Sequence, residues 1–272
     1  MSIDGGGRGR EGGGGGHWYA VVPWSYRYLQ SAAARLFYLS IQETPQPKWR
    51  QLANRRYMPT TSVTSARGDL TNTNVLVPQA MPEFVTKYPD IISRLKDTGI
   101  FDKSPHERPN HIIMNEYHAG QGIMPHEDGP SYYPTVATLS LGSHTVMHYY
   151  RYADEPSAAT SVGRPIDPTP ALSLLLEPRS LVITSSELYT SHLHGISETD
   201  IDLFSVHASH EDASRVDDGR VRVANWEMLT GKTEKRAVRE GGTLVRGTRY
   251  SLTCRDVGRV ARVGPGTTFG RR

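Results

Sequence analysis

A histidine and an aspartate stand two positions apart in the run His126-Glu127-Asp128. On an extended segment, residues two apart project to one face, so this imidazole and this carboxylate can chelate one metal ion. With a second histidine from a distant segment, they form the two-histidine-one-carboxylate set that holds non-haem Fe(II) and leaves coordination positions open for substrate and oxygen. A surface histidine beside a turn is the alternative interpretation of the same pair.

The remaining metal ligand must come from another histidine of the chain. The candidates are His144, His148, His192, His194, His207 and His210. Two of them, His192 and His194, follow a strand-like segment over residues 181–184 and a turn, and His194 directly precedes Gly195. Residue type does not distinguish these two, and either can equally be an exposed side chain without a ligand.

The last extended segment of the chain alternates polar and apolar residues. Its polar positions share one face: Arg249, Ser251, Thr253 and Arg255. An arginine offers paired donors that match a carboxylate, and the serine two residues on adds another donor. This face either meets solvent, as in an ordinary half-exposed strand, or lines a cavity that binds an anion, and the pattern favours neither.

A second pair of polar residues, Asn115 and Tyr117, also shares one face of an extended segment. Both side chains can donate hydrogen bonds to carboxylate oxygens. An asparagine at a sheet edge and a tyrosine at the rim of a core would show the same spacing.

A folded domain must position these residues, and the amino-acid composition is consistent with one. Of the 272 residues, 37% are hydrophobic and 22% charged, which is enough apolar material for a core. No apolar run approaches the roughly 18 residues of a membrane helix, and the first residues lack the apolar region of a secretory signal, so we expect neither a secretory leader nor a membrane partner. The single cysteine, Cys254, excludes a disulfide framework and a cysteine zinc cluster. We expect an intracellular protein of the nucleus, the cytoplasm or both, and a monomer.

Charge is spread unevenly along the chain. Residues 232–272 contain 11 lysines and arginines but only 3 acidic residues, whereas the preceding 231 residues are net acidic. Such a basic end can contact the phosphate backbone of a nucleic acid. A solvated surface with a few internal arginines explains the same distribution.

Hydrophobic periodicity predicts a leading helical region followed by strands. Apolar positions at three-to-four spacing predict an amphipathic helix over residues 81–99, and residues 26–39 are a second helix candidate. Alternating runs predict strands over residues 112–117, 135–141, 146–150, 171–176, 181–184 and 244–257. Many short strands after a leading helix predict a mainly β fold with flanking helices, in the form of a two-sheet jelly roll.

This pattern suggests a division of the chain into segments. We expect a disordered Gly/Arg-rich leader over 1–16, a helical lid region over 17–110, a core over 111–260 with loop insertions near 155–170 and 197–241, and a basic flexible tail over 261–272.

In chain order, these motifs resemble the AlkB group of Fe(II)/2-oxoglutarate dioxygenases, and within it the AlkB homolog 6 branch. The matching stretches span roughly residues 47–260: 47–49, 51–52, 115–117, 122–130, 132–136, 141–146, 174–181, 193–196 and 246–249. The chain departs from the branch over residues 18–46, which lack its acidic helical lead-in. It departs again over residues 58–68, where the branch has a Gln-x-Trp-Gly segment in the lid over the nucleobase.

The resemblance implies a double-stranded β-helix core with Fe(II) held by His126, Asp128 and His194, which favours His194 over His192. The co-substrates implied are 2-oxoglutarate and O2.

The resemblance also implies residues that bind the co-substrate. Arg249, with Ser251 and Tyr117, would bind the distal carboxylate of 2-oxoglutarate, and Arg255 and Asn115 would lie nearer the metal. Ser251 stands where many AlkB-like proteins have asparagine, which keeps a hydrogen-bonding group.

The activity implied is oxidative demethylation of N-methylated RNA or DNA, in which the methyl group leaves as formaldehyde. Two alternatives share the same fold: a non-catalytic module that binds nucleic acid, and a hydroxylase of protein side chains.

Overall fold

The computed structural model describes residues 8–9, 19–23, 38–44, 49–61, 74–76, 81–87, 89–153, 164–206 and 219–261. For residues 8–9, 19–23, 58–61 and 84 it describes the backbone alone. The tail over 262–272 and nearly all of the expected leader lie outside the described residues. The same holds for most of the helix expected over 26–39, of which residues 38–39 begin a helical turn that runs to residue 42.

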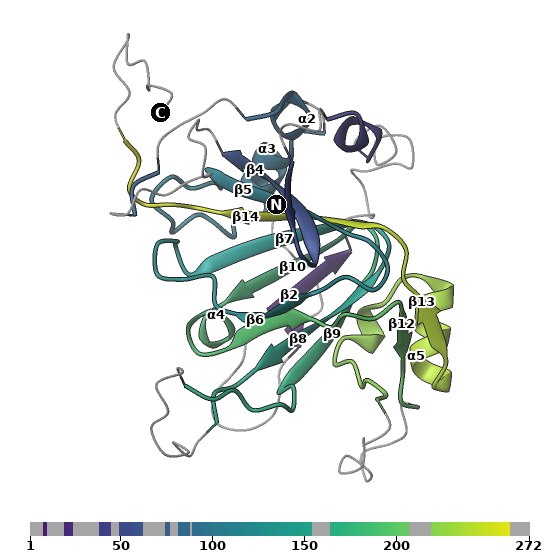
Figure 1. The fold of residues 1–272 in the computed structure, drawn as a ribbon. Helices are drawn as coiled ribbons and strands as arrows, with labels where there is room; N and C mark the ends of the chain where they lie inside the picture. Colours follow the sequence, from purple (N-terminus) through teal and green to yellow (C-terminus); the bar gives the residue numbers. More distant parts are fainter. Residues whose placement is uncertain are drawn as a thin grey trace.

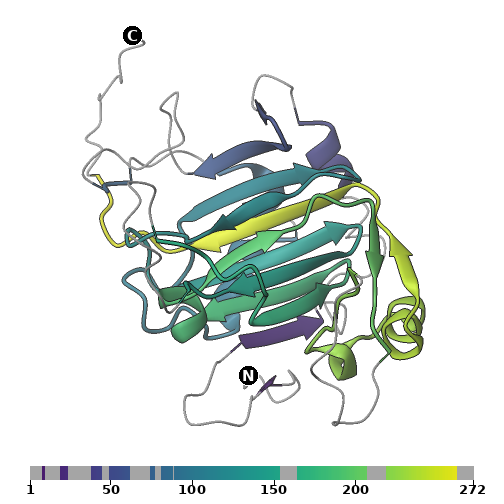
Figure 2. The ribbon, with the colours of Figure 1, turned by 60° about the horizontal axis from the view of Figure 1, so that its bottom comes forward.

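Two antiparallel sheets face each other and form the body of the molecule (Figures 1 and 2). The larger, here called the major sheet, has the strand order β1 (Arg8–Gly9), β2 (Tyr19–Pro23), β10 (Ser180–Ser185), β7 (Thr135–Gly142), β14 (Arg249–Arg255), β5 (His111–Tyr117), β4 (Arg55–Thr61) and β3 (Arg50–Leu52). The minor sheet has the order β6 (Ile123–His126), β11 (Leu193–Ile196), β8 (Thr145–Tyr150) and β9 (Leu172–Leu176). The fold is therefore the mainly β double-stranded β-helix that the sequence predicts.

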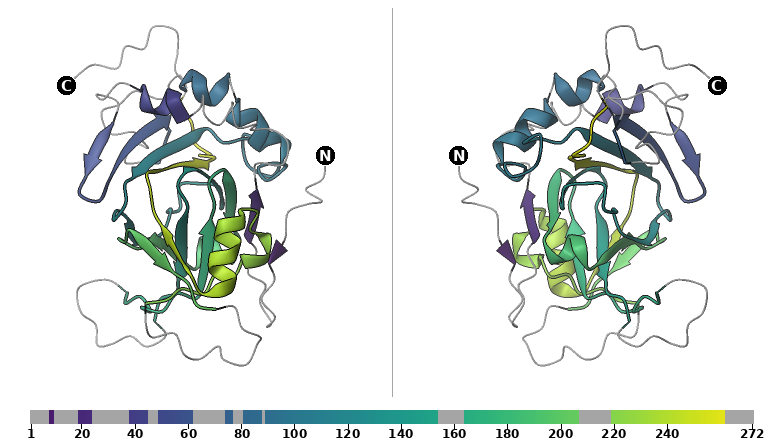
Figure 3. Two further views of the ribbon diagram at one scale, coloured as in Figure 1. Left: turned by 90° about the vertical axis from the view of Figure 1, so that its right-hand side faces the viewer. Right: turned by 90° about the vertical axis from the view of Figure 1, so that its left-hand side faces the viewer.

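The outer face of the major sheet carries the largest apolar cluster. Tyr250, Leu252 and Cys254 of β14 are buried there against two short helices, α2 (Glu83–Thr86) and α3 (Ile91–Asp97). Figure 3 shows these helices on the side of the major sheet that faces away from the minor sheet. Burial of this apolar surface fixes the plane of the strands that carry the polar inner face.

Two smaller clusters complete the core. One fills part of the space between the sheets and includes Met147, Leu174 and Val182. The other covers the outer face of the minor sheet with α5 (Lys232–Glu240), the short helix η3 (Trp226–Met228) and the two-stranded sheet of β12 (Ile201–Leu203) and β13 (Thr243–Val245). None of the helices within the described residues is long or apolar enough to span a bilayer.

The single helix predicted over residues 81–99 is wrong: the structure has two helices with a break between them. Pro89 lies at the break, and proline lacks the backbone N–H that a continuous helix needs there. Asp90 then has a left-handed backbone (φ 50°), and its carboxylate accepts a hydrogen bond of 3.1 Å from the backbone N–H of Ser93, which caps α3. A new helix therefore begins after Asp90, although the three-to-four spacing of the apolar residues continues across the break.

The single strand predicted over residues 244–257 is also wrong, because β13 and β14 belong to different sheets. Between them, the buried Arg246 donates to both carboxylate oxygens of Asp202 in β12, at 2.8 and 2.6 Å. This pair holds the chain away from the line of β14.

Two regions contain more regular structure than the sequence predicts. The expected loop over 197–241 includes β12, η3 and α5, and the expected helical region over 17–110 contributes β2, β3 and β4 to the major sheet. Strands β6 and β11 were not predicted either, because each has only four residues and little alternation.

Candidate active site

Neighbouring strands of the minor sheet bring His126 and His194 together. The two residues are direct Cα partners in the pairing of β6 with β11, and their ring centroids are 4.4 Å apart. Asp128 follows β6 by two residues, and its Oδ2 lies 3.9 Å from Nε2 of His194. One ligand atom from each of the three residues lies within 4.8 Å of the others. Within the described part of the chain, no other group of histidine, cysteine or acidic residues has this arrangement.

The glycine after His194 permits this close approach of the strands. A Cβ atom at Gly195 would lie 3.0 Å from both the carbonyl oxygen of Ile123 and the nitrogen of Pro125. Glycine therefore lets β6 lie against β11 at this point.

A backbone carbonyl orients one of these histidines, and burial keeps the other neutral. Nδ1 of His126 lies 2.9 Å from the carbonyl oxygen of Met124, which can only accept, so Nδ1 carries a proton and Nε2 is the nitrogen available to a metal ion. Burial lowers the pKa of His194 to about 4, so this imidazole is neutral at pH 7. Neutral imidazoles with a fixed tautomer are the usual metal ligands.

The Asp128 carboxylate is ionised and held by an arginine. Burial alone would raise its pKa, but the charge of Arg255 and a hydrogen bond from the same side chain outweigh burial and keep the pKa below its usual value. Arg255 donates to Oδ1, which leaves Oδ2 on the side of His194. The Arg255 guanidinium carbon lies 4.9 Å from the ring centroid of Tyr132.

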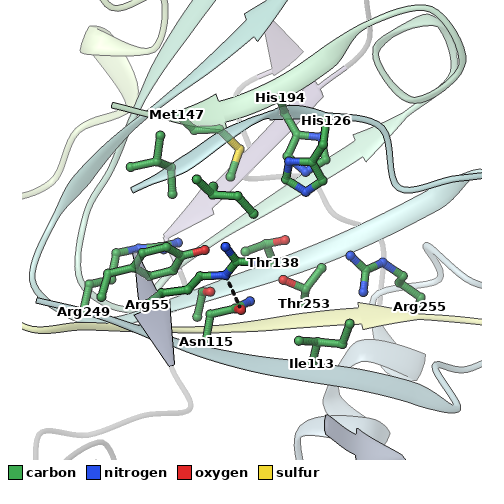
Figure 4. Close-up of a pocket in the computed structure, with 14 residues that line it drawn as sticks. Arg55, Ile113, Asn115, His126, Thr138, Met147, His194, Arg249, Thr253 and Arg255 are labelled. Carbon is green, nitrogen blue, oxygen red and sulfur yellow. Dashed lines mark hydrogen bonds between the residues drawn. The ribbon is translucent and has the colours of Figure 1, made fainter. Parts of the chain in front are cut away.

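The polar face of β14 lines a cavity between the two sheets and does not meet solvent (Figure 4). Arg249 and Ser251 are only 2% and 3% exposed. In the register with β5, Arg249 pairs with Tyr117 and Ser251 with Asn115, so the two polar pairs noted in the sequence lie side by side. The cavity of about 100 Å³ also borders His126 and His194. Its volume exceeds the roughly 10–15 Å³ that one water needs, so a small molecule can enter.

Arg249 lacks a counter-charge. Its Nη2 donates to Oγ of Ser140 at 2.9 Å, but its buried Nε and Nη1 have no hydrogen-bond partner. No carboxylate of the described residues forms an ion pair with it. Burial lowers the pKa of Arg249 to about 10, and the guanidinium remains charged at pH 7. Because a buried charge without a partner is strongly unfavourable, this end of the cavity is complementary to an anion.

The other histidines that sequence reasoning considered lie away from this cavity. His144 lies 3.2 Å from Oδ2 of Asp202, and His148 contacts Oγ of Ser173 at 2.8 Å. His192 is buried, with its Nδ1 3.1 Å from the carbonyl oxygen of Glu187. His207 and His210 lie outside the described residues.

Sequence reasoning missed Arg55, which lines the cavity from the start of β4. Its Nε donates to Oδ1 of Asn115 at 3.2 Å, as the dashed line in Figure 4 shows. The two residues are 60 positions apart in the chain, and only the pairing of β4 with β5 relates them. Thr138 of β7 and Met147 of β8 also line the cavity and were not predicted.

Comparison with known proteins gives relatives that cover most or about half of the chain. A Danio rerio protein described as "Probable RNA/DNA demethylase ALKBH6" is 33% identical over 238 residues, which are 86% of this chain and 85% of that protein. An uncharacterised protein of Acanthamoeba polyphaga mimivirus is 33% identical over 40% of this chain and 47% of its own length. A Xenopus tropicalis protein, tRNA (carboxymethyluridine(34)-5-O)-methyltransferase alkbh8, is 27% identical over 48% of this chain and 17% of its own length. No protein-family profile matches the sequence.

Solved structures also align with most of the length of this chain. OsALKBH1 has a TM-score of 0.46 at 13% identity and covers 88% of this chain and 97% of its own. A 2OG-Fe(II) oxygenase-family protein of Burkholderia pseudomallei has a TM-score of 0.43 at 12% identity, over 89% of this chain and 88% of its own. The sequence match to the Danio rerio protein decides the family, since it spans most of both chains. The chain belongs to the AlkB-like Fe(II)/2-oxoglutarate-dependent dioxygenases, in the AlkB homolog 6 branch.

Proposed function

We propose that this dioxygenase oxidatively demethylates N-methylated nucleic acid, RNA or DNA. As a member of its family, it uses Fe(II), with 2-oxoglutarate and O2 as co-substrates. The observation that carries the proposal is the adjacency of two features: a compact set of two histidines and one aspartate, and a cavity whose buried arginine lacks a counter-charge.

In this proposal, His126, Asp128 and His194 hold the metal. Two imidazoles and an ionised carboxylate are a donor set suited to Fe(II). When bound, Fe(II) supplies the oxidation of a substrate C–H bond by O2, coupled to decarboxylation of 2-oxoglutarate to succinate. Arg255 would orient Asp128 and keep it ionised, and Met124 would orient His126.

The polar face of β14 would hold the co-substrate. The unpaired Nε and Nη1 of Arg249 can donate to the distal carboxylate of 2-oxoglutarate, with the hydroxyls of Ser251 and Tyr117 as further donors. Asn115 and Arg255 would contact the end nearer the metal. Because the cavity walls are buried, they would also exclude bulk water from the bound acid.

The substrate class is inferred from the relatives. The Danio rerio relative is described as a "Probable RNA/DNA demethylase", and the Xenopus tropicalis relative as a tRNA methyltransferase. Both descriptions name a nucleic acid, which supports a nucleic acid as the substrate here, and the demethylase description supports a methyl group on it as the site of oxidation. On such a methyl group, oxidation and loss of formaldehyde would complete the demethylation.

The test combines binding and turnover. Anaerobic addition of Fe(II) and 2-oxoglutarate to the wild-type protein should produce a metal-to-ligand charge-transfer band. In air, methylated oligonucleotides should yield succinate, formaldehyde and a 14 Da loss by mass spectrometry. His126→Ala should abolish both, while His118→Ala, at a histidine whose side chain is 58% exposed, should retain both.

Other outcomes would contradict the proposal. Binding of nucleic acid without succinate formation by any preparation would indicate a non-catalytic module. A 16 Da gain on a protein substrate, without demethylation of oligonucleotides, would indicate a side-chain hydroxylase.

A further inference from the structure

A row of three residues crosses the inner face of the major sheet at the end of the cavity away from the metal ligands. In the pairing of β4 with β5, Arg56 is the partner of Glu116, so the same register places Arg55 beside Tyr117. Tyr117 is in turn the partner of Arg249. All three side chains line the cavity. Two arginines therefore flank one tyrosine from opposite sides.

The described residues offer neither arginine an acidic partner. Arg55 donates to the neutral amide of Asn115, and Arg249 to the hydroxyl of Ser140. No carboxylate of the described chain forms an ion pair with Arg55 or Arg249, and Asp128 is already paired with Arg255. The cavity is thus lined by two arginines without an acidic partner, Arg55 and Arg249, in addition to the paired Arg255.

We propose that Arg55 is a second cationic residue of the 2-oxoglutarate site and that, with Arg249, it makes the site select a keto acid with a second carboxylate. The inference rests on the proposed function, since it assigns a further residue to the same co-substrate. The bond to Asn115 fixes the position of Nε, and the rest of the guanidinium extends into the cavity. From there it donates to the distal carboxylate opposite Arg249.

Arg55 also belongs to the β3–β4 hairpin, so a ligand bound to Arg55 would contact this hairpin. The hairpin turn places Asn54 against Glu198, with the Asn54 amide donating to the Glu198 carboxylate. Glu198 lies shortly after β11, the strand that carries His194. The hairpin therefore bridges the two sheets, and Arg55 immediately follows the bridging residue. Binding of a dicarboxylate to Arg55 should stabilise the hairpin in this position.

Calorimetry on the full chain with Mn(II) in place of Fe(II) tests the assignment without turnover. Arg55→Met should weaken 2-oxoglutarate binding roughly tenfold or more, the effect expected for a lost charge-assisted hydrogen bond. Arg50→Met is the matched control, because Arg50 lies on the same hairpin, is also half-buried and does not line the cavity. The 2-oxoglutarate affinity of this variant should stay within about twofold of wild type, the small effect expected of a substitution outside the cavity.

A second ligand separates a charge contact from a general disturbance of the site. Pyruvate has the keto acid group but no distal carboxylate, so Arg55→Met should leave its affinity unchanged. Arg55→Lys should bind 2-oxoglutarate more tightly than Arg55→Met, since it retains the charge without the planar fork. Equal loss of affinity for pyruvate and 2-oxoglutarate would overturn the proposal.

Hydrogen exchange provides a readout that needs no variant. In the wild-type protein with Mn(II), 2-oxoglutarate should slow amide exchange over residues 50–57, and pyruvate should not. Unchanged exchange, or 2-oxoglutarate affinity that Arg55→Met does not reduce, would overturn the inference alone. Failure of 2-oxoglutarate to bind the wild-type protein at all would overturn the proposed function as well.

Discussion

The two faces of β14 are both buried, but burial stabilises the fold through one face and not through the other. On the outer face, Tyr250, Leu252 and Cys254 pack under the helices, and burial of their apolar surface stabilises the fold. On the inner face, Arg249 at the start of the strand is also buried but keeps two donors without partners. Unpaired buried donors lower stability unless a ligand satisfies them. The apolar outer face therefore supplies the stability of this strand, and the inner face keeps unpaired donors that can bind an anion.

The largest effect should follow from a change on the inner face. Arg249→Met should weaken 2-oxoglutarate binding by more than tenfold, because loss of a charged partner for a desolvated carboxylate costs about 2–5 kcal/mol. The free energy of unfolding of the ligand-free protein should not fall, since an unpaired buried charge is removed. Calorimetry and urea unfolding measure the two quantities. Unchanged affinity would remove Arg249 from the co-substrate site.

A change on the outer face should do the reverse. Leu252→Ala should lower the free energy of unfolding by about 3 kcal/mol, because it leaves a cavity in a fully buried cluster. The folded fraction should bind 2-oxoglutarate as wild type does, since Leu252 points away from the cavity. Urea unfolding with calorimetry at a temperature where the variant is folded checks both. A loss of affinity as large as that of Arg249→Met would show that the two faces are not separable.

The minor sheet offers a second comparison, between two histidines on adjacent strands, His148 of β8 and His194 of β11. Burial lowers the pKa of both His148 and His194 to about 4. His194 faces the cavity and Asp128, whereas His148 faces the other side of the sheet, where Nδ1 contacts Ser173. The two histidines therefore have similar pKa values in different surroundings. His194 lies in the candidate metal site, whereas Nδ1 of His148 is hydrogen-bonded to the Ser173 hydroxyl.

This second comparison predicts a smaller, pH-dependent effect. His148 is neutral in the folded protein and has its ordinary pKa near 6.5 when unfolded, so its contribution to stability is complete above pH 6.5. It is lost as the pH falls from about 6.5 toward about 4. Between pH 7 and pH 5 the loss is about 2 kcal/mol from this residue.

His148→Gln should remove that share of the pH dependence. The measurement is urea unfolding of the metal-free wild type and variant at pH 7 and at pH 5. The variant is expected to be less stable at pH 7 and to lose less between the two pH values. An identical slope for both proteins would mean that His148 does not titrate with unfolding.

Much of the scaffold was predictable from local patterns. The strands over 112–117, 135–141 and 146–150 appear as β5, β7 and β8 with bounds shifted by one residue at most, because alternation records which positions are buried. The predictions failed where a local break leaves the pattern intact. Pro89 and Asp90 interrupt an apolar repeat, and the Arg246–Asp202 pair separates two strands that read as one.

The candidate site divides in the same way. The sequence by itself determined that a histidine and an aspartate share a short segment, that Arg249 and Ser251 share a face, and which family the chain resembles. Only the tertiary structure decided that this face is covered by a second sheet, that His194 lies beside His126 while His192 does not, and that Arg55 joins the cavity. The physical reason is that backbone geometry sets the direction of a side chain relative to its neighbours in the chain. What lies in that direction depends on strand pairing between distant segments.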